Sequence, residues 1–580
     1  MLPLFITGQA ALNHLTSTLD LAGNRVDGLS RRGRLFKRGI RIPCSVESCI
    51  LGASLFFTLF VNQRFWQAWA SGQDWSTVKS WLPTIAVAVL LTAVHCLILG
   101  LVLGRRTARP VLAALFIVTA LAMHYMQRYT VFFDAGMVRN IFHTDLNEAS
   151  ELLSASMFVD VLVYGFLPAL LMSRVALPRR TVWRAVTVRA VFMLAALLAA
   201  GGSLLVAFQD LSALLRNQKE VRYLITPANF IASSIRVVTA DSGEISLPRI
   251  PVGADAVQAA GSHNGKPRLL VVVVGETVRA ANWGLNGYGR QTTPELAASD
   301  VVNFPKMTSC GTNTEVSVPC MFSPFGRKNY DEKQIRRHES VLHVMEHAGV
   351  KSIWRDNQSG CKGVCDGLEV QRPEAQRDAR LCNGKHCLDE ILLAGLESEL
   401  QKNPRDLVIV LHQLGNHGPA YSQRYPDNYR RFLPTCDNPD LGKCTREQIV
   451  NSYDNALLYT DHFLVQTLHR LQSQNTHDAA FLYLSDHGES LGEKGVYLHG
   501  LPYAIAPREQ TEVPMLLWLS PGFSAASAID GACLRARAAQ PASHDNLFHT
   551  MLGLMQVQTS SYDAAYDLLA GCRGGARTGT

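Results

Sequence analysis

Two carboxylates and an imidazole follow apolar runs at separate places in the chain. Glu276 follows the run at 268–274, and Asp486 and His487 follow the run at 480–484. Ligands of open α/β sheets bind beyond the carboxyl ends of the strands, so we expect these side chains to meet at one edge. Zinc accepts such ligands and commonly keeps a fourth position for a reacting group. Singly, each is more often a surface or capping group. Further imidazoles nearby in the sequence are His412, His417 and His499.

A hydroxyl-rich segment, SCGTNTEVSVPCMFS at 309–323, carries the candidate nucleophile. A disulfide between Cys310 and Cys320 would close a short loop and hold a hydroxyl in place, which lowers the entropic cost of reaction. A metal ion can activate a threonine hydroxyl that is otherwise a poor nucleophile. The alternative is a surface loop stapled by a disulfide. Spacing leaves the choice open among Thr308, Thr312, Thr314 and Ser317.

The elements that must position these residues are short, nearly continuous apolar runs between longer amphipathic stretches. The runs lie at 268–274, 350–354, 407–411, 480–484 and 513–519. Such runs are typical of strands buried on both faces. Their alternation with helical stretches predicts an α/β domain with a largely parallel sheet, which we place at 267–580.

The first third of the chain differs from the rest in its apolar character. The 580 residues are 47% hydrophobic and 18% charged, and mean hydropathy is +0.06. Each of five apolar stretches approaches the roughly 20 residues that a helix needs to cross a bilayer. They lie at 43–62, 82–104, 110–126, 157–177 and 188–208. We therefore predict a five-helix transmembrane domain at 43–208.

Charged and aromatic residues around these stretches predict one orientation. Basic runs at 31–41, 105–109 and 178–184 flank the ends that would face the cytoplasm. The loop after the first stretch carries interfacial tryptophans instead. An odd number of crossings then puts everything after Phe208 outside the cytoplasm. The net charge of +7 fits membrane topology better than nucleic-acid binding, and we expect no nucleic-acid partner.

Two segments have less definite character. Residues 1–42 would form a cytoplasmic extension, and the first 30 do not fit a signal peptide. Residues 209–266 would form an amphipathic and linker segment. Within it, 211–223 is consistent with a helix on the membrane surface, and 243–266 is rich in Gly, Pro, Ser and Ala.

Ten of the 13 cysteines lie from Cys310 onward. Close, even-numbered cysteines in an exported domain indicate disulfides. A zinc ribbon built from the second and third pairs is the alternative, and their unequal spacings disfavour it. The candidate pairs are Cys310 with Cys320, Cys361 with Cys365, Cys382 with Cys387 and Cys436 with Cys444, and a fifth would join Cys533 with Cys572.

Several strings together resemble the lipid A phosphoethanolamine transferase family, which includes the mobile colistin-resistance enzymes. They are GETVR (275–279), SCGTNTEVSVPCMFS (309–323), HQLGNHGPAYSQRYP (412–426), SDHGESLGE (485–493) and YLHG (497–500). They occur in the family's order and separations, and the resemblance runs from about residue 34 to the C-terminus. It implies a membrane α-helical bundle of five transmembrane helices followed by an α/β domain of alkaline phosphatase/sulfatase type.

The resemblance also implies roles for individual residues. Thr314 matches the nucleophile, which is also a zinc ligand, and Glu276, Asp486 and His487 match the other ligands of one tight Zn²⁺ site. The remaining matches concern substrate. His417 and His499 match histidines that bind the phosphoryl group or a second, weaker zinc, and Lys362 matches a lysine near the substrate phosphate.

Asn140, Thr144 and Glu148 match residues that contact the donor headgroup. Their spacing would put them on one face of a single helix. The alternative is that this face is only the solvated polar side of a helix in an extracytoplasmic loop. Glu315, directly after the matched nucleophile, departs from the family, which usually has a small residue there.

The function that these features predict is transfer of phosphoethanolamine from phosphatidylethanolamine to a lipid A phosphate through a covalent phosphothreonine. The enzyme would lie in the bacterial inner membrane with its catalytic domain in the periplasm, and it would confer polymyxin resistance. Alternative hypotheses are transfer to a sugar of the lipopolysaccharide core, a membrane-bound phosphodiesterase or sulfatase, and a non-catalytic sensor.

Overall fold

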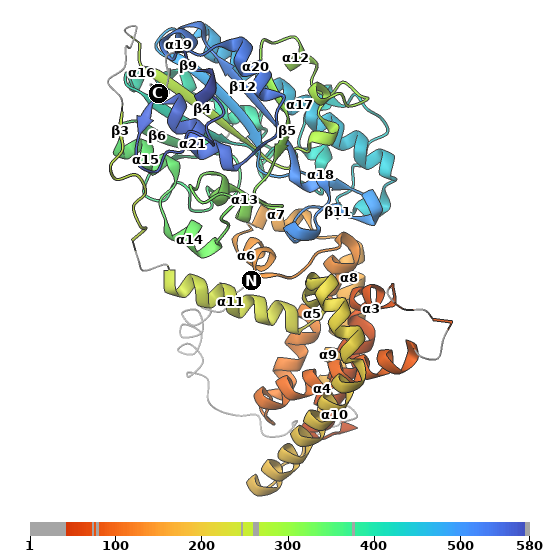
Figure 1. Ribbon diagram of the computed structural model, residues 1–580. Coiled ribbons are helices and arrows are strands. Elements are labelled where there is room, and N and C mark those ends of the chain that lie inside the picture. The colour runs from red at the N-terminus through yellow and green to blue at the C-terminus, as the bar shows by residue number, and fades with distance from the viewer. Residues whose placement is uncertain are drawn as a thin grey trace, which may run out of the picture.

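A computed structural model describes residues 42–574, except 72, 74, 77–79, 145, 245–247, 259–265 and 374–377. Apart from Ile42, the predicted extension at 1–42 lies outside the described residues. Figure 1 shows a helical part formed by the described chain up to α11 and a larger part in which helices surround a sheet. The second part begins after the helix α11 (Ala228–Glu244), close to the predicted start of the α/β domain.

Four helical stretches are long and apolar enough to cross a membrane. They are α4 (Trp81–Val102), α5 (Ala108–Tyr129), the continuous stretch Ala155–Ser173 made of α8, η4 and α9, and α10 (Val182–Asn217). They coincide with four of the five predicted spans. On α10 only Ala196 and Ala207 have buried side chains, so most of its apolar surface faces outward, where lipid would cover it.

The first predicted span is bent. Val46–Val61, which combines α2 and η2, meets α3 (Gln63–Ala70) at 58°. Asn62 lies at the break, fully buried, and its amide donates to the carbonyls of Phe57 and Thr226. With this pair counted as one span, the described residues contain five candidate crossings.

The segment after the last span differs from the predicted surface helix at 211–223. Helix α10 continues without a break to Asn217, because 209–217 contains good helix formers and no Gly or Pro. The next long helix is α11. Figure 1 shows α11 running crosswise between the membrane helices and the α/β part. The short helices α6 (Ala135–His143) and α7 (Leu146–Glu151) also lie between the two parts (Figure 1).

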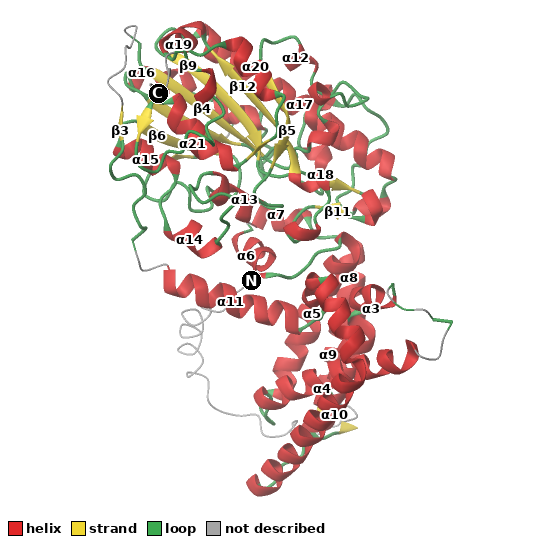
Figure 2. Cartoon of the chain, in the orientation of Figure 1, coloured by secondary structure: helices red, strands yellow, loops and turns green. Residues whose placement is uncertain are grey.

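An eight-stranded sheet forms the centre of the α/β part (Figure 2). Its order is β13-β5-β12-β9-β4-β8-β6-β7. In chain order these strands are β4 (Arg268–Gly275), β5 (Val302–Thr308), β6 (Lys351–Asp356), β7 (Glu369–Gln371), β8 (Leu407–His412), β9 (Asp478–Ser485), β12 (Glu512–Leu519) and β13 (Ala542–Ser543). Outside this sheet, β1 (Ile42–Pro43) pairs with β2 (Val175–Ala176), β10 (Ser490–Leu491) with β11 (Tyr497–Leu498), and β3 (Val257–Gln258) with β14 (Val557–Gln558).

Helices cover both faces of the sheet. On β4, Leu270, Val272 and Val274 belong to one apolar core, and the alternate residues belong to the core on the opposite face. α13 (Thr314–Met321), α15 (Val341–His347) and α21 (Asp545–Leu554) contribute to the first core, and α16 (Leu396–Lys402) and α17 (Arg446–Ser473) to the second. The remaining helices of this part are α12 (Pro294–Ala297), α14 (Glu332–Arg337), α18 (Arg508–Thr511), α19 (Pro521–Ala526) and α20 (Gly531–Ala538).

The sheet is less uniformly parallel than its apolar runs predict. The strands β9, β4, β8, β6 and β7 are parallel to one another, but β12 runs antiparallel to β9 and β5. The chain leaves β9, forms the small β10–β11 hairpin and re-enters the sheet from the same edge, so β12 must run in the opposite direction. Strand β5 was not predicted, because exposed residues interrupt its apolar pattern.

Five disulfides join the cysteines of the α/β part. Cys533 with Cys572 is the fifth pair, alongside Cys310 with Cys320, Cys361 with Cys365, Cys382 with Cys387 and Cys436 with Cys444. The second and third pairs are each closed within themselves. The alternative of four thiolates around one zinc ion is therefore excluded.

Candidate metal centre and nucleophile

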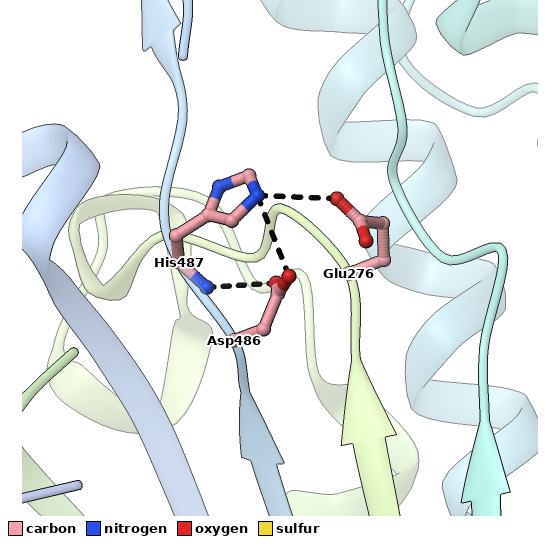
Figure 3. A group of neighbouring side chains, drawn as sticks. All are labelled: Glu276, Asp486 and His487. Atoms are coloured by element: carbon pink, nitrogen blue, oxygen red, sulfur yellow. Dashed lines mark hydrogen bonds and ion pairs between the residues drawn. The ribbon is translucent and has the colours of Figure 1, made fainter. Parts of the chain in front are cut away.

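The carboxyl ends of two neighbouring strands bring the acids and the imidazole together. In the parallel ladder of β4 and β9, Gly275 lies opposite Ser485. The residues that follow, Glu276 on one side and Asp486 with His487 on the other, therefore leave the sheet at the same place (Figure 3). This is the edge at which the sequence predicted a site.

The three side chains form a compact and fully buried group. His487 Nε2 lies 3.3 Å from Glu276 Oε1 and 3.4 Å from Asp486 Oδ2, as Figure 3 shows. Asp486 Oδ1 accepts a hydrogen bond of 2.7 Å from the amide of His487 and another of 3.2 Å from that of Thr277. Backbone amides thus fix Asp486 with its other oxygen turned toward the imidazole.

This group has the composition and spacing of a metal site. One ligand atom from each of Glu276, Asp486 and His487 lies within 4.8 Å of the others. Among the described residues, Glu276 Oε1 and Asp486 Oδ2 are buried and have no hydrogen-bond partner. Buried carboxylate oxygens without donors are costly unless a cation neutralises them. Two carboxylates and an imidazole suit zinc, so the residues present fit the ion that the sequence predicted.

The pKa shifts of these side chains also indicate that the two carboxylates favour a positive charge beside them. Burial alone would raise the pKa of Glu276, but the close contact and charge of His487, with the charges of His417 and His499, hold that pKa below its usual value. Burial would lower the pKa of His487, yet the charges of Asp486 and Glu276 raise it well above 6.5. The carboxylates thus favour a positive charge at this position, and a metal ion would replace the proton.

Of the four hydroxyls that spacing left open, one reaches this group. Thr314 begins helix α13 after Asn313, whose side chain caps the helix by accepting from the amide of Val316. Thr314 Oγ1 donates to Glu276 Oε2 at 3.0 Å and lies 3.4 Å from His487 Nε2. The others bond to backbone carbonyls: Thr308 to Ala542, Thr312 to Leu501 and Ser317 to Asp486.

Comparisons with known proteins agree with this geometry. Residues 91–242 match the family model described as phosphoethanolamine transferase EptA/EptB, and 268–557 match the sulfatase model. Phosphoethanolamine transferase EptA of Escherichia coli K12 is 38% identical over 547 residues, which cover 93% of this chain and 99% of the relative. The chain belongs to the phosphoethanolamine transferase family.

Other relatives extend this result. Phosphatidylethanolamine transferase Mcr-1 from Escherichia coli is 38% identical over 82% of this chain and 90% of its own length. The solved structure of the integral membrane protein lipooligosaccharide phosphoethanolamine transferase A from Neisseria meningitidis matches with a TM-score of 0.88 at 35% identity. It covers 92% of this chain and 99% of that one. The helical part and the α/β part therefore share one architecture with a solved member of the family.

Two histidines predicted to contact substrate border the metal group of this transferase. The ring centroid of His499 lies 4.4 Å from that of His487 and 5.6 Å from that of His417. Glu489, fully buried, lies 3.4 Å from His499 Nδ1. His412 does not join them: its Nδ1 lies 2.8 Å from Asp356.

Lys362 lies close to Glu315, the residue directly after Thr314. Lys362 Nζ donates to Ser359 Oγ at 2.6 Å and lies 3.8 Å from Glu315 Oε2. Burial would raise the pKa of Glu315. The hydrogen bond from His143 and the charges of Arg336 and Lys362 outweigh burial and hold that pKa below its usual value.

The trio matched to donor contacts does not share one helix, contrary to the sequence prediction. Helix α6 ends at His143, and Thr144 is extended, with ψ of 130°. The Thr144 hydroxyl donates to the carbonyl of Asn140, and such bonding competes with continuation of a helix. Glu148 belongs to the separate helix α7, and its side chain lies outside the described residues.

Sequence reasoning missed two residues that support the site. Gln358 donates to Glu276 Oε2 at 2.8 Å. His544, fully buried at the start of α21, accepts from the amide of Cys310 at 3.1 Å and donates to the carbonyl of Ser485 at 3.0 Å. It thus ties the nucleophile segment to the end of β9. Neither residue stands in a recognisable pattern, so only their proximity in space identifies them.

Proposed function

We propose that this chain transfers phosphoethanolamine from phosphatidylethanolamine to a phosphate of lipid A. The observation that carries the proposal is the Thr314 hydroxyl held against the buried group of Glu276, Asp486 and His487. Relatives support the acceptor class: the Neisseria structure is named a lipooligosaccharide phosphoethanolamine transferase. Lipid A modified in this way carries less negative charge and attracts cationic peptides less strongly, which would give polymyxin resistance.

In the first half-reaction Thr314 Oγ1 attacks the donor phosphorus. A bond forms between this oxygen and phosphorus, the bond from phosphorus to the glycerol oxygen breaks, and diacylglycerol leaves. The hydroxyl proton has an acceptor in Glu276 Oε2 at 3.0 Å. His499 and His417 lie on the same side as His487, and either can protonate the departing oxygen. The product is phosphoethanolamine esterified to Thr314.

In the second half-reaction a lipid A phosphate oxygen attacks the same phosphorus. The bond from phosphorus to Thr314 Oγ1 breaks, and the threonine regains its proton. Lys362 and the two histidines would balance the negative charge of the phosphoryl group as it moves. This sequence is a ping-pong scheme with one covalent intermediate.

Zinc would be held by Glu276, Asp486, His487 and the oxygen of Thr314. When bound, it supplies a Lewis acid that favours the ionised hydroxyl and neutralises phosphoryl charge. A second, weaker zinc would lie at His417 and His499. Gln358 and the backbone amides at Asp486 orient the carboxylates whether or not the ion is present.

Placement in the membrane follows from the substrates. Donor and acceptor are both amphiphiles, so an anchored enzyme meets them at the bilayer surface. We propose that the helical part spans the bacterial inner membrane and that the α/β part lies in the periplasm, where its disulfides are stable. The domain limits would be 43–208 for the membrane part, 209–266 for the connection and 267–580 for the catalytic part.

The decisive experiment is the lipid A mass spectrum of cells with and without the full-length chain. Expression should add the mass of phosphoethanolamine, and Thr314→Ala should abolish the addition. Thr308→Ala is the matched control, because that hydroxyl contacts only the Ala542 carbonyl among its described partners. Lipid A that still gains the mass in Thr314→Ala cells would remove this threonine from the mechanism.

The same cells separate the alternative acceptors. Kdo(2)-lipid A phosphoethanolamine 7''-transferase of Escherichia coli K12 is 27% identical over 87% of this chain, so the core sugar is the second candidate. Phosphoethanolamine found on the isolated core instead of lipid A would select it. Release of free phosphoethanolamine without an acceptor would indicate a hydrolase.

Removal of the metal tests whether transfer requires zinc. Purified protein stripped by a chelator should lose transfer activity and regain it with zinc. Glu276→Gln should lower the zinc content of the purified protein, measured by mass spectrometry of the metal. Glu512→Gln is a suitable control, because Glu512 pairs with Arg508 on the surface. Full activity in a sample verified to be metal-free would contradict the proposal.

A further inference from the structure

Glu315 is a buried carboxylate at an unusual place, directly after the proposed nucleophile. Its side chain is 1% exposed. Three cationic or titratable groups from three separate segments surround it: His143 at the end of α6, Arg336 in α14 and Lys362. His143 Nδ1 and Arg336 Nη2 lie 2.8 and 2.9 Å from Oε1. A carboxylate buried this deeply is stable in its charged form only beside cationic or hydrogen-bonding partners.

The two oxygens of Glu315 have different surroundings. Oε1 receives both short contacts, and Arg336 also donates to the Glu315 carbonyl. Among the described residues Oε2 has no hydrogen-bond partner, and Lys362 Nζ stands 3.8 Å away. Without Glu315, His143 and Lys362 would each lose this anionic partner, and Arg336 would keep its pair with Glu332. Glu315 therefore allows a residue of the membrane part to sit beside the proposed phosphate-binding lysine.

Helix α6 also packs closely against helix α13, which begins with Thr314, and against the loop at Gly500. A Cβ placed on Gly136 would lie 3.4 Å from Val316 Cγ2, one residue after Glu315. A Cβ on Gly500 would lie 2.6 Å from Met137 Cε, and the φ of +88° at Gly500 also favours glycine there. The amide of Gly500 donates to the carbonyl of Thr312 at 2.7 Å.

A second ionic contact extends the same interface. Arg139 of α6 pairs with Glu332 of α14, which also pairs with Arg336. Packing contacts and one continuous chain of charged side chains thus fix the position of α6 relative to Thr314.

We propose that Glu315 is a positioning residue that docks α6 onto the nucleophile segment, so that a donor headgroup held at Asn140 and Thr144 meets Thr314. This inference rests on the proposed function. Glu315 touches neither the metal group nor the reacting atoms; it acts through His143 and Lys362. Its loss should weaken use of the donor while the metal site stays intact.

The test uses the full-length chain in lipid nanodiscs with headgroup-labelled phosphatidylethanolamine and lipid A. We expect Glu315→Gln and His143→Gln each to raise the donor KM about tenfold, the size of one lost charge-assisted hydrogen bond, with a smaller change in kcat. The double variant should be no worse than either single variant, because both remove the same contact. Zinc content should equal that of the wild type.

Asp440→Asn is the matched control. Asp440 joins the two parts elsewhere, through Arg128 in α5 at 2.9 Å and Ser156 in α8. This variant should leave the donor KM unchanged. Three outcomes would overturn the proposal. The donor KM could rise equally in Asp440→Asn or stay unchanged in Glu315→Gln. The double variant could also raise KM by the product of the two single effects.

Hydrogen exchange provides a readout that does not need activity. Amides 137–143 of α6 should exchange faster in Glu315→Gln than in the wild type or Asp440→Asn. If the wild type transfers no labelled headgroup from phosphatidylethanolamine to lipid A, the proposed function fails, and the exchange measurement still decides whether Glu315 docks α6. Unchanged exchange in Glu315→Gln would refute the docking role.

Discussion

Thr314 owes its candidate role to two neighbours that lie far from it in the chain. Glu276 is 38 residues away and His487 is 173 residues away, yet both contact the hydroxyl. Thr312, two residues earlier, has its hydroxyl bonded to the carbonyl of Leu501. Position against the candidate metal group therefore distinguishes Thr314 from the other three hydroxyls of this segment, because all four are aliphatic alcohols.

His544 shows how a buried neutral residue links the site to pH. Burial lowers the pKa of His544 to about 3, from 6.5 for an exposed imidazole. As pH falls below 6.5 the unfolded chain takes up a proton at this residue and the folded chain does not. Stability present above pH 6.5 is then lost, by about 2 kcal/mol between pH 6.5 and pH 5.

We predict that His544→Gln weakens this pH dependence. A glutamine amide can accept from the Cys310 amide and donate to the Ser485 carbonyl, but it does not titrate. Thermal midpoints of the full-length protein in detergent at pH 7.5 and pH 5 would measure the effect. The wild type should lose more stability than the variant. An equal fall in both proteins would show that His544 does not contribute.

At the scale of the element, helix α13 places the candidate nucleophile Thr314 at its first turn. Asn313 caps the helix through its side-chain oxygen at 3.0 Å from the Val316 amide, which fixes the direction in which the helix leaves the loop. The disulfide of Cys310 with Cys320 joins the residues just before and within α13. Cap and disulfide restrict the same short stretch of backbone around Thr314.

Removal of the cap should therefore cost both stability and activity. We predict that Asn313→Ala lowers the free energy of unfolding by about 1 kcal/mol and lowers kcat, because α13 loses its fixed start. Asn313→Ser retains a capping oxygen and should stay close to the wild type in both measurements. If the serine variant loses as much as the alanine variant, the side chain acts by something other than capping.

At the scale of the whole molecule, ionic contacts hold the catalytic part to the membrane part. Arg128 pairs with Asp440, and Glu151 of α7 pairs with Arg424 and His386. These contacts lie at the ends of the helices that the charge pattern places outside the cytoplasm. This arrangement agrees with the proposed placement of the α/β part and its disulfides in the periplasm.

Orientation can be measured with reporter fusions. We predict that an alkaline phosphatase reporter is active when fused after residue 574 and inactive when fused after Arg106, between α4 and α5. A fluorescent protein that matures only in the cytoplasm should show the opposite pattern. The physical reason is the excess of basic residues at 105–109 and 178–184, which retains those loops in the cytoplasm. An active phosphatase after Arg106 would reverse the topology.

Local patterns in the sequence determined much of this protein. Apolar length predicted the spans, continuous β-branched runs predicted β4, β6, β8 and β9, and strand ends predicted where the acids and His487 would meet. Close spacing predicted four cysteine pairs, and Cys533 with Cys572 remained as the fifth. These features depend on residues that are neighbours in the chain, so a single sequence suffices to recognise them.

Only the tertiary structure decided the rest. The direction of β12, the end of α6 at His143, the contacts of Thr314 with Glu276 and His487 and the partners of Glu315 all depend on the folded chain. His544 bonds to a residue 234 positions away, and no local pattern records such a contact. The sequence specifies the chemistry of each side chain, whereas the charges and atoms that surround it are set only when the chain folds.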